Sequence, residues 1–333
     1  MNIVIFFDKT IYMNKFYLIE NPDLFQGRKY LNTNKNYFEG WYFKNTNSEE
    51  GISFIPGISI EEDNKKSFIQ VITNNSSYFI NYNIEDFKFN INPFYIKIAN
   101  NTFSKDGVHI DINDEKQNLS VYGDIQYSDS KNIRTNFLNP NIMGPFSYVP
   151  FMECNHAILS MQNNACGLIN INNKLINFNN GIGYIEKDWG CSFPKDYIWC
   201  QANNFDKSNC NFMLSVADIP FKIFNFKGLI CVLMIDNKEF KFTTYNNSKL
   251  VKCDVNNNFL NIILRKGKYI LDIKSNYEMG NRLSAPVRGK MEKDIFESIS
   301  SLISVTLKED NNIIFSDTSK NCGLEIVKDN LDK

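Results

Sequence analysis

The sequence is poor in the side chains that most often hold metals and nucleotides. It has only two histidines, His109 and His156, and its eight cysteines form no C-x-x-C pair. Zinc sites need clustered thiolates or imidazoles, so the sequence predicts no metal centre. No G-x-S-x-G, P-loop or G-x-G-x-x-G motif occurs, and a Ser-His-Asp triad has little support. We therefore expect a protein that works without a cofactor.

Charge of one sign and long apolar runs are also missing. The 36 basic residues nearly balance 37 acidic residues, for a net charge of -1, so no basic face for nucleic acid is expected. No apolar stretch approaches the ~20 residues of a membrane helix. The run "IVIFF" at residues 3–7 is too short for the core of a signal peptide. The sequence predicts a soluble, cytoplasmic protein.

Alanine is scarce, whereas 28 phenylalanines and 16 tyrosines are present, and this balance favours strands over helices. Apolar side chains alternate with polar ones in "YFINY" (78–82), "VHIDI" (108–112) and "LSVYGDIQYS" (119–128). A period of two is typical of half-buried antiparallel strands. Similar segments recur through the second half at the spacing found in sandwiches and barrels. The sequence predicts an all-β protein.

Three local predictions depart from simple strands. Residues 129–152, rich in proline, are expected to form a long connection or an irregular lid. The segments 156–161 and 166–171 are expected to pair as a hairpin. Met291, Ile295 and Ile299 lie four residues apart, which indicates a short helix over 291–299.

With 333 residues, the chain exceeds the usual size of one domain. "EGWYFK" at 39–44 and "EKDWGCSF" at 186–193 each place a glutamate before a tryptophan, and each precedes a run of strands. This echo is a weak repeat signal. We expect two β domains, residues 1–176 and 177–333.

The segment "GYIEKDWGCSFPKDYIWCQANNF" (183–205) crowds acids among aromatic rings. A carboxylic acid surrounded by apolar groups has a raised pKa and keeps its proton near neutral pH. Such an acid can protonate a carbon–carbon double bond. The candidate catalytic residues are Glu186 and Asp188, together with Glu153 and His156 from a second segment.

Aromatic faces stabilise a developing carbocation, and a dry pocket keeps water from quenching it. The candidate substrate-binding residues are therefore aromatic: Trp41, Tyr42, Trp189, Phe193, Tyr197 and Trp199. Each candidate also has a structural interpretation. Trp41 can plug a barrel floor, the Glu-Lys-Asp sequence can be a solvated turn, and His156 can be a satisfied structural histidine.

Several of these blocks resemble the tocopherol cyclase family, from about Asn21 to Val327. The resemblance rests on these segments: "YFEGWYFK" (37–44), "VPFMECNHAILSM" (149–161), "GIGYIEKDWGCSFPKDYIWCQANNF" (181–205), "LSAPVRGKM" (283–291) and "CGLEIV" (322–327). This family is related in style to carotenoid hydratases and to other proteins of two lipocalin-like halves. The resemblance thus implies two lipocalin-like antiparallel halves with little helix.

The resemblance also implies closure of a chromanol ring on a prenylated quinol. A protonated acid adds its proton to the alkene, and the phenol oxygen attacks the resulting cation. The family's motif residues carried onto this chain are Glu186, Asp188, Trp189 and the pair Glu153 and His156. The expected partner is an apolar small molecule, an isoprenoid or prenylquinol. A substrate this apolar implies at least transient contact with a membrane surface.

Two other hypotheses remain open from the sequence. A lipocalin-like carrier of an isoprenoid, quinone or fatty acid needs the cavity but no buried acid. A purely structural pair of β-sandwiches has no cavity at all.

Overall fold

The computed structural model describes residues 15–328 except 91, 151, 222–223 and 257, so the apolar run at 3–7 lies outside the described residues. Almost all regular structure in the described residues is β-strand, which confirms the predicted all-β fold class. The described part of the chain contains one short α-helix, α1 (Lys15–Glu20), and no helix there is long and apolar enough to cross a membrane.

The first sheet has twelve antiparallel strands. In spatial order they are β4 (Ser77–Asn83), β3 (Asn64–Thr73), β2 (Gly51–Glu61), β1 (Tyr37–Thr46), β12 (Gly181–Gly190), β10 (Cys154–Ile171), β9 (Leu119–Lys131), β8 (Gly107–Asp114), β7 (Asn101–Ser104), β6 (Tyr95–Ile98) and β5 (Phe87–Phe89), with β11 (Lys174–Asn177) beside β10.

The second sheet has ten antiparallel strands. In spatial order they are β16 (Lys238–Thr243), β15 (Phe224–Ile235), β14 (Cys210–Phe221), β13 (Tyr197–Ala202), β22 (Asn312–Val327), β21 (Lys290–Glu309), β19 (Tyr269–Asn276), β18 (Phe259–Lys266) and β17 (Lys249–Asn256), with β20 (Asn281–Val287) beside β21. Single turns of 3₁₀ helix are η1 (Gly27–Tyr30), η2 (Ile84–Asp86), η3 (Glu115–Gln117), η4 (Gly144–Tyr148) and η5 (Thr244–Asn246).

Each sheet curls round its own apolar core. Ile80 and Phe87 come from the two edge strands of the first sheet, yet both belong to one core cluster. A second cluster fills the second sheet in the same way. A third cluster lies between the sheets and takes Tyr42 from β1 and Trp199 from β13. Because side chains alternate along a strand, one strand supplies both a barrel core and the layer between the halves.

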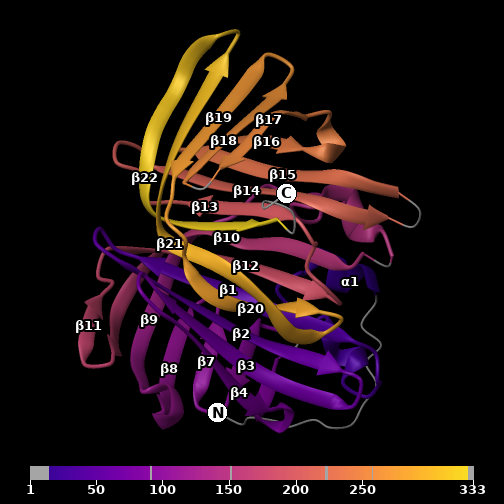
Figure 1. The fold of residues 1–333 in the computed structure, drawn as a ribbon, viewed down its shortest axis with the longest axis vertical. Helices are drawn as coiled ribbons and strands as arrows, with labels where there is room; N and C mark the ends of the chain where they lie inside the picture. The colour runs from indigo at the N-terminus through magenta and orange to yellow at the C-terminus, as the bar shows by residue number, and fades with distance from the viewer. Residues whose placement is uncertain (1–14, 91, 151, 222–223, 257, 329–333) are drawn as a thin grey trace.

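The two halves lie one above the other in Figure 1, and the long strands β21 and β22 extend from the second half toward the first. β21 contacts β2, and β20 contacts β4. The chain passes from the first sheet to the second between Gly190 and Tyr197. Sheet membership is not itself a domain boundary, so the division into 1–176 and 177–333 stays a prediction.

Two local predictions are wrong. Residues 156–161 and 166–171 belong to one strand, β10, rather than to a hairpin. The residues that join the two segments continue the strand, and the pairing of β10 with β12 shifts register between Ile158 and Asn163. The expected helix over 291–299 lies within β21, where its apolar residues are equally compatible with a period of two.

The glutamate–tryptophan echo has a different meaning from a repeat. β1 and β12 are antiparallel neighbours in the same sheet, with Glu39 opposite Trp189 and Trp41 opposite Lys187. The second copy therefore does not open the second sheet. Lys187 and Glu39 form an ion pair with 2.5 Å between Nζ and Oε1, both fully buried, and Nζ lies over the rings of Trp41 and Trp189. The echo is one paired structural motif at the base of the first core.

Candidate active site

A cavity of about 180 Å³ lies between the two sheets, not inside either barrel core. Its wall is mainly apolar and draws on both halves of the chain. Of the predicted aromatic residues, Tyr42, Phe193, Tyr197 and Trp199 line it. A chamber therefore exists, which contradicts the hypothesis of two filled sandwiches.

The acids reach this cavity because of the alternation along β12. Tyr184, Glu186 and Asp188 point into the layer between the sheets, whereas Ile185 and Lys187 point into the first core. In the register of the sheet, Glu186 lies between Tyr42 of β1 and Ile158 of β10. Asp188 in turn lies opposite His156 on β10. One strand thus places two carboxyl groups, two residues apart, on the cavity side.

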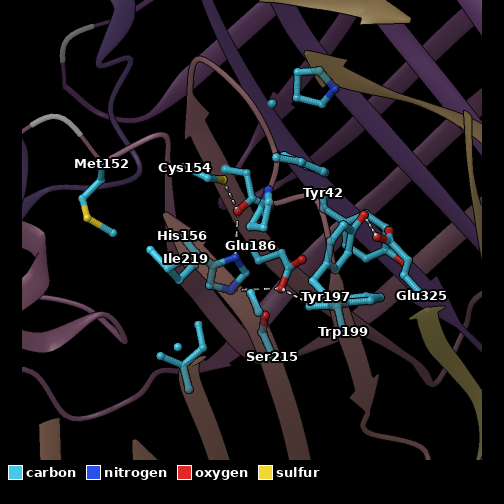
Figure 2. Close-up of a pocket in the computed structure, with 18 of the residues that line it drawn as sticks. Tyr42, Met152, Cys154, His156, Glu186, Tyr197, Trp199, Ser215, Ile219 and Glu325 are labelled. Carbon is cyan, nitrogen blue, oxygen red and sulfur yellow. Dashed lines mark hydrogen bonds and ion pairs between the residues drawn. The ribbon is translucent and has the colours of Figure 1, made fainter. Parts of the chain in front are cut away.

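His156 connects the two carboxyl groups (Figure 2). Its Nδ1 lies 2.9 Å from Oδ1 of Asp188, and its Nε2 lies 3.5 Å from Oε2 of Glu186. The Nε2 atom is buried and has no hydrogen-bond partner among the described residues. All three residues line the cavity, so the unpartnered Nε2 is available to a ligand or to Glu186.

The charges of this trio follow from burial and proximity. Burial alone would lower the pKa of His156, but the Asp188 and Glu186 carboxylates raise it to about 9, so the imidazole carries a proton at neutral pH. Burial raises the pKa of Glu186 to about 7, against the opposing effect of the His156 cation. Near neutral pH, a substantial fraction of Glu186 is therefore an uncharged acid beside an ion pair.

The two oxygens of Glu186 have different surroundings. Tyr184 donates its hydroxyl to Oε2 at 2.5 Å, and the indole Nε1 of Trp199 donates to the same oxygen at 3.2 Å. No described residue donates a hydrogen bond to Oε1. This arrangement orients the carboxyl group and leaves Oε1 for a proton and for contact with a ligand.

The aromatic wall lies beside this acid. The rings of Tyr42 and Trp199, one from each sheet, meet edge to face with centroids 5.4 Å apart. Phe193 and Tyr197 also meet edge to face, at 6.0 Å. Such faces carry negative quadrupole density and can stabilise a cation within about 6 Å.

The structure does not bring every predicted residue to the cavity. Glu153 is exposed, and its main-chain oxygen accepts hydrogen bonds from the amides of Cys191 and Ser192. Trp41 is fully buried in the first core, where Nε1 donates to the main-chain oxygen of Asp23. Trp189 packs on the same core. These three side chains do not line the cavity.

Sequence reasoning missed two acids. Glu325 of β22 lines the cavity, and Glu297 of β21 lies directly opposite it in the register. Ile295, Glu297 and Ile299 lie two residues apart on one face of β21, and all three are buried. The expected helix over the same residues obscured that period of two.

His156, Glu186 and Asp188 also form the one group of three candidate metal ligands within the described residues, with ligand atoms within 4.8 Å of one another. One imidazole and two carboxylates suit several divalent cations. Chelation is therefore included as a control in the experiment below.

Comparison with known proteins connects this geometry to a family. A family model described as tocopherol cyclase-like matches residues 130–327, more than half of the chain. The match includes the segments that carry His156, Glu186, Asp188 and Glu325. A search of curated protein sequences gives no match.

Solved structures share the fold at low sequence identity. Kievitone hydratase from Nectria haematococca superposes with a TM-score of 0.51 at 11% identity, covering 91% of this chain and 93% of that chain. CghA in complex with Sch210972 gives 0.53 at 8%, covering 88% of each chain. A protein described as a putative AttH from Nitrosomonas europaea gives 0.50 at 12%, covering 86% and 91%. At these identities the likeness shows the lipocalin-like fold alone.

Proposed function

Because the chain belongs to the tocopherol cyclase-like family, we propose that its buried acid protonates a carbon–carbon double bond and starts an intramolecular cyclisation. The family and the fold support an enzyme of the cyclase or hydratase type. The finer proposal is that the substrate is a prenylated quinol and the product a chromanol or a related isoprenoid. One observation carries it: Glu186 is a buried acid with one oxygen left free, in a cavity with aromatic walls.

Glu186 supplies the proton in this mechanism. The O–H bond at its Oε1 breaks as a C–H bond forms at the less substituted alkene carbon, leaving a tertiary cation on the neighbouring carbon. The resulting Glu186 carboxylate lies beside the protonated His156, whose charge stabilises it. Asp188 is a positioning residue, because its hydrogen bond to Nδ1 keeps His156 protonated and oriented.

The aromatic wall then protects the cation until the ring closes. Tyr42, Tyr197 and Trp199 present ring surfaces in a mainly apolar space, which limits capture of the cation by water. The phenol oxygen attacks the cation, a C–O bond forms, and the phenolic proton leaves. The reaction written in this way requires no cofactor.

The size of the cavity bears on the ligand. An engineered cavity of about 150 Å³ holds a benzene molecule. The cavity here, about 180 Å³, therefore suits one substituted ring or a short prenyl unit, and a longer chain would have to extend beyond it. Transient contact with a membrane surface and a cytoplasmic location stay predictions.

A carrier is the alternative, and the buried trio argues against it. Burying ionisable groups carries a desolvation cost that an apolar ligand does not require. A carrier would bind equally well with neutral side chains at these positions.

Incubation with a short-chain prenyl benzoquinol in deuterated water tests the proposal. We expect a chromanol of one handedness with deuterium at the protonated carbon, whereas spontaneous acid closure gives a racemate. The same assay with a chelator excludes a metal-assisted route if turnover is unchanged. Recovery of bound, unaltered quinol after long incubation would show that the protein is a carrier.

A further inference from the structure

A second pair of carboxyl groups borders the same cavity. Glu325 lies opposite Trp199 of β13 and opposite Glu297 of β21 in the register of the second sheet. Side chains at directly paired positions point to the same face, so Glu325, Glu297 and the Trp199 ring share one face. Figure 2 shows Glu325 on the far side of Tyr197 and Trp199 from His156.

Tyrosine hydroxyl groups hold this pair. Tyr42 donates to Oε1 of Glu297 at 2.5 Å, and Tyr197 donates to Oε2 of Glu325 at 2.6 Å. Both tyrosines line the cavity. Glu297 is fully buried, and no described residue donates a hydrogen bond to its Oε2. Hydrogen bonds from two cavity-lining tyrosines therefore hold the two carboxyl groups, and one carboxyl oxygen of the pair lacks a hydrogen-bond donor from the described residues.

Two adjacent buried carboxyl groups do not both ionise. Burial and the neighbouring Glu325 raise the pKa of Glu297 well above its ordinary value. Burial raises the pKa of Glu325 to about 7, while hydrogen bonds from Tyr197 and with Glu297 act in the opposite direction. Glu297 thus holds the shared proton, and Glu325 is the member that ionises near neutral pH.

The cyclisation needs a group that accepts the phenolic proton, and the described residues offer few. The acids that line the cavity there are Glu186, Asp188 and Glu325. Glu186 is the proton donor in the proposed function, and Asp188 is hydrogen-bonded to His156. Glu325 is therefore the acid left to accept the phenolic proton. Trp199 connects Glu325 to the proton donor Glu186, because the indole of Trp199 donates to Glu186 while the backbone of Trp199 pairs with that of Glu325.

We propose that Glu325 is the proton acceptor for ring closure and that Glu297 is a positioning residue that keeps Glu325 ionised and aimed at the phenol. This inference rests on the proposed function. As the phenol oxygen bonds to the cation, its O–H bond breaks and the proton passes to the Glu325 carboxylate. Glu186 has lost one proton and Glu325 has gained one, so the proton count of the protein is unchanged. Exchange with water after product release restores both groups.

The pH dependence of kcat/KM tests the inference. The wild-type profile should be bell-shaped, because Glu325 must be ionised and Glu186 protonated. The rising limb reports ionisation of Glu325, the falling limb reports loss of the proton from Glu186, and both should lie near pH 7. Glu325→Gln should remove the rising limb and lower kcat by roughly 100-fold or more, the range for losing a general base. KM should change only a few-fold. Glu278→Gln, at an exposed glutamate of the second half that does not line the cavity, is the matched control and should retain the whole bell-shaped profile.

The Glu297→Gln variant distinguishes a role of Glu297 in positioning Glu325 from a purely structural role of Glu297. The glutamine amide is a weaker hydrogen-bond donor than the carboxyl group it replaces, so the pKa of Glu325 should rise and the rising limb should move to higher pH while the falling limb stays. Infrared titration of the carboxyl bands in the unliganded variants measures the protonation of the Glu297–Glu325 pair directly and does not depend on turnover. A Glu325→Gln enzyme that keeps the wild-type rising limb would overturn the inference.

Deuterium labelling distinguishes this failure from failure of the proposed function. In Glu325→Gln, Glu186 still delivers deuterium to the alkene, and a cation that does not close returns the other hydrogen of that carbon to the Glu186 carboxylate as a proton. Deuterium should therefore appear in recovered substrate while chromanol formation drops. If the wild type forms chromanol and the rising limb survives in Glu325→Gln, only the acceptor assignment fails. If the wild type incorporates no deuterium and forms no chromanol, the proposed function fails.

Discussion

Replacing Glu186 by glutamine should sharply reduce turnover and, at the same time, stabilise the protein in a pH-dependent way. Glutamine keeps an oxygen that can accept from Tyr184 and Trp199, but it has no acidic proton to deliver. Loss of a general acid costs roughly 100- to 10,000-fold in rate. Because the side chain has almost the same shape, the cavity and the binding of a prenyl quinol should change little.

The stability effect follows from the raised pKa of Glu186. A carboxyl with a folded-state pKa of about 7, against an ordinary 4.5, favours folding below pH 4.5 and loses that contribution as the pH rises through 7. At 1.36 kcal/mol per pKa unit, the loss is about 3 kcal/mol. Glutamine carries no such penalty. The variant should match the wild type near pH 4.5 and exceed it at pH 8, by a Tm difference on the order of 5 °C.

Thermal unfolding at the two pH values, combined with the chromanol assay, measures both effects. A Tm difference that is the same at pH 4.5 and pH 8 would show that Glu186 ionises as freely as a surface glutamate. Undiminished turnover would show that the proton comes from another group. Either result contradicts the reasoning from burial.

Three further changes test neighbouring parts of the structure. In Asp188→Asn, one of the two carboxylates that oppose the effect of burial is gone, so the pKa of His156 should fall from about 9, as read by imidazole NMR, where only two histidines contribute. Turnover should fall as well; an unchanged titration would refute the proposed role of Asp188. Lys187→Met leaves Glu39 buried without its cation and should cost roughly 3–5 kcal/mol in unfolding experiments, part of which Glu39→Gln should recover in the double variant. Glu153→Gln should change neither stability nor turnover by more than about 0.5 kcal/mol, since its side chain is exposed; a large loss of rate would return it to the list of candidate acids.

The all-β architecture could be predicted because alternation is a local property of each strand. Glu186 could be nominated from the sequence because Tyr184 and Trp189 lie near it in the same segment, and its catalytic role stays a prediction. Trp41 and Trp189 were less predictable as ligand contacts. They lie on the core side of β1 and β12, and which face of a strand meets the cavity depends on how the sheets pack.

The second carboxyl pair depends on long-range register, which one sequence does not contain. Glu297 and Glu325 are separated along the chain, and only the pairing of β21 with β22 places them opposite each other. The location of the cavity is similarly non-local. The interiors of both halves are filled with apolar side chains, and the cavity lies where the halves meet.

The two faces of β12 explain why a buried ion pair and an acid site occur in one strand. A slip of one residue in the β1–β12 pairing would move Glu186 and Asp188 into the first core and Lys187 into the cavity. Lys187 resists that slip, because its ammonium group bonds Glu39 and also donates to the main-chain oxygens of Pro22 and Leu24. These contacts are available in one register only. The contacts of Lys187 on the core side of β12 therefore fix the position of Glu186 and Asp188 on the cavity side of the same strand. The side chains on the core side do this although none of them touches the cavity.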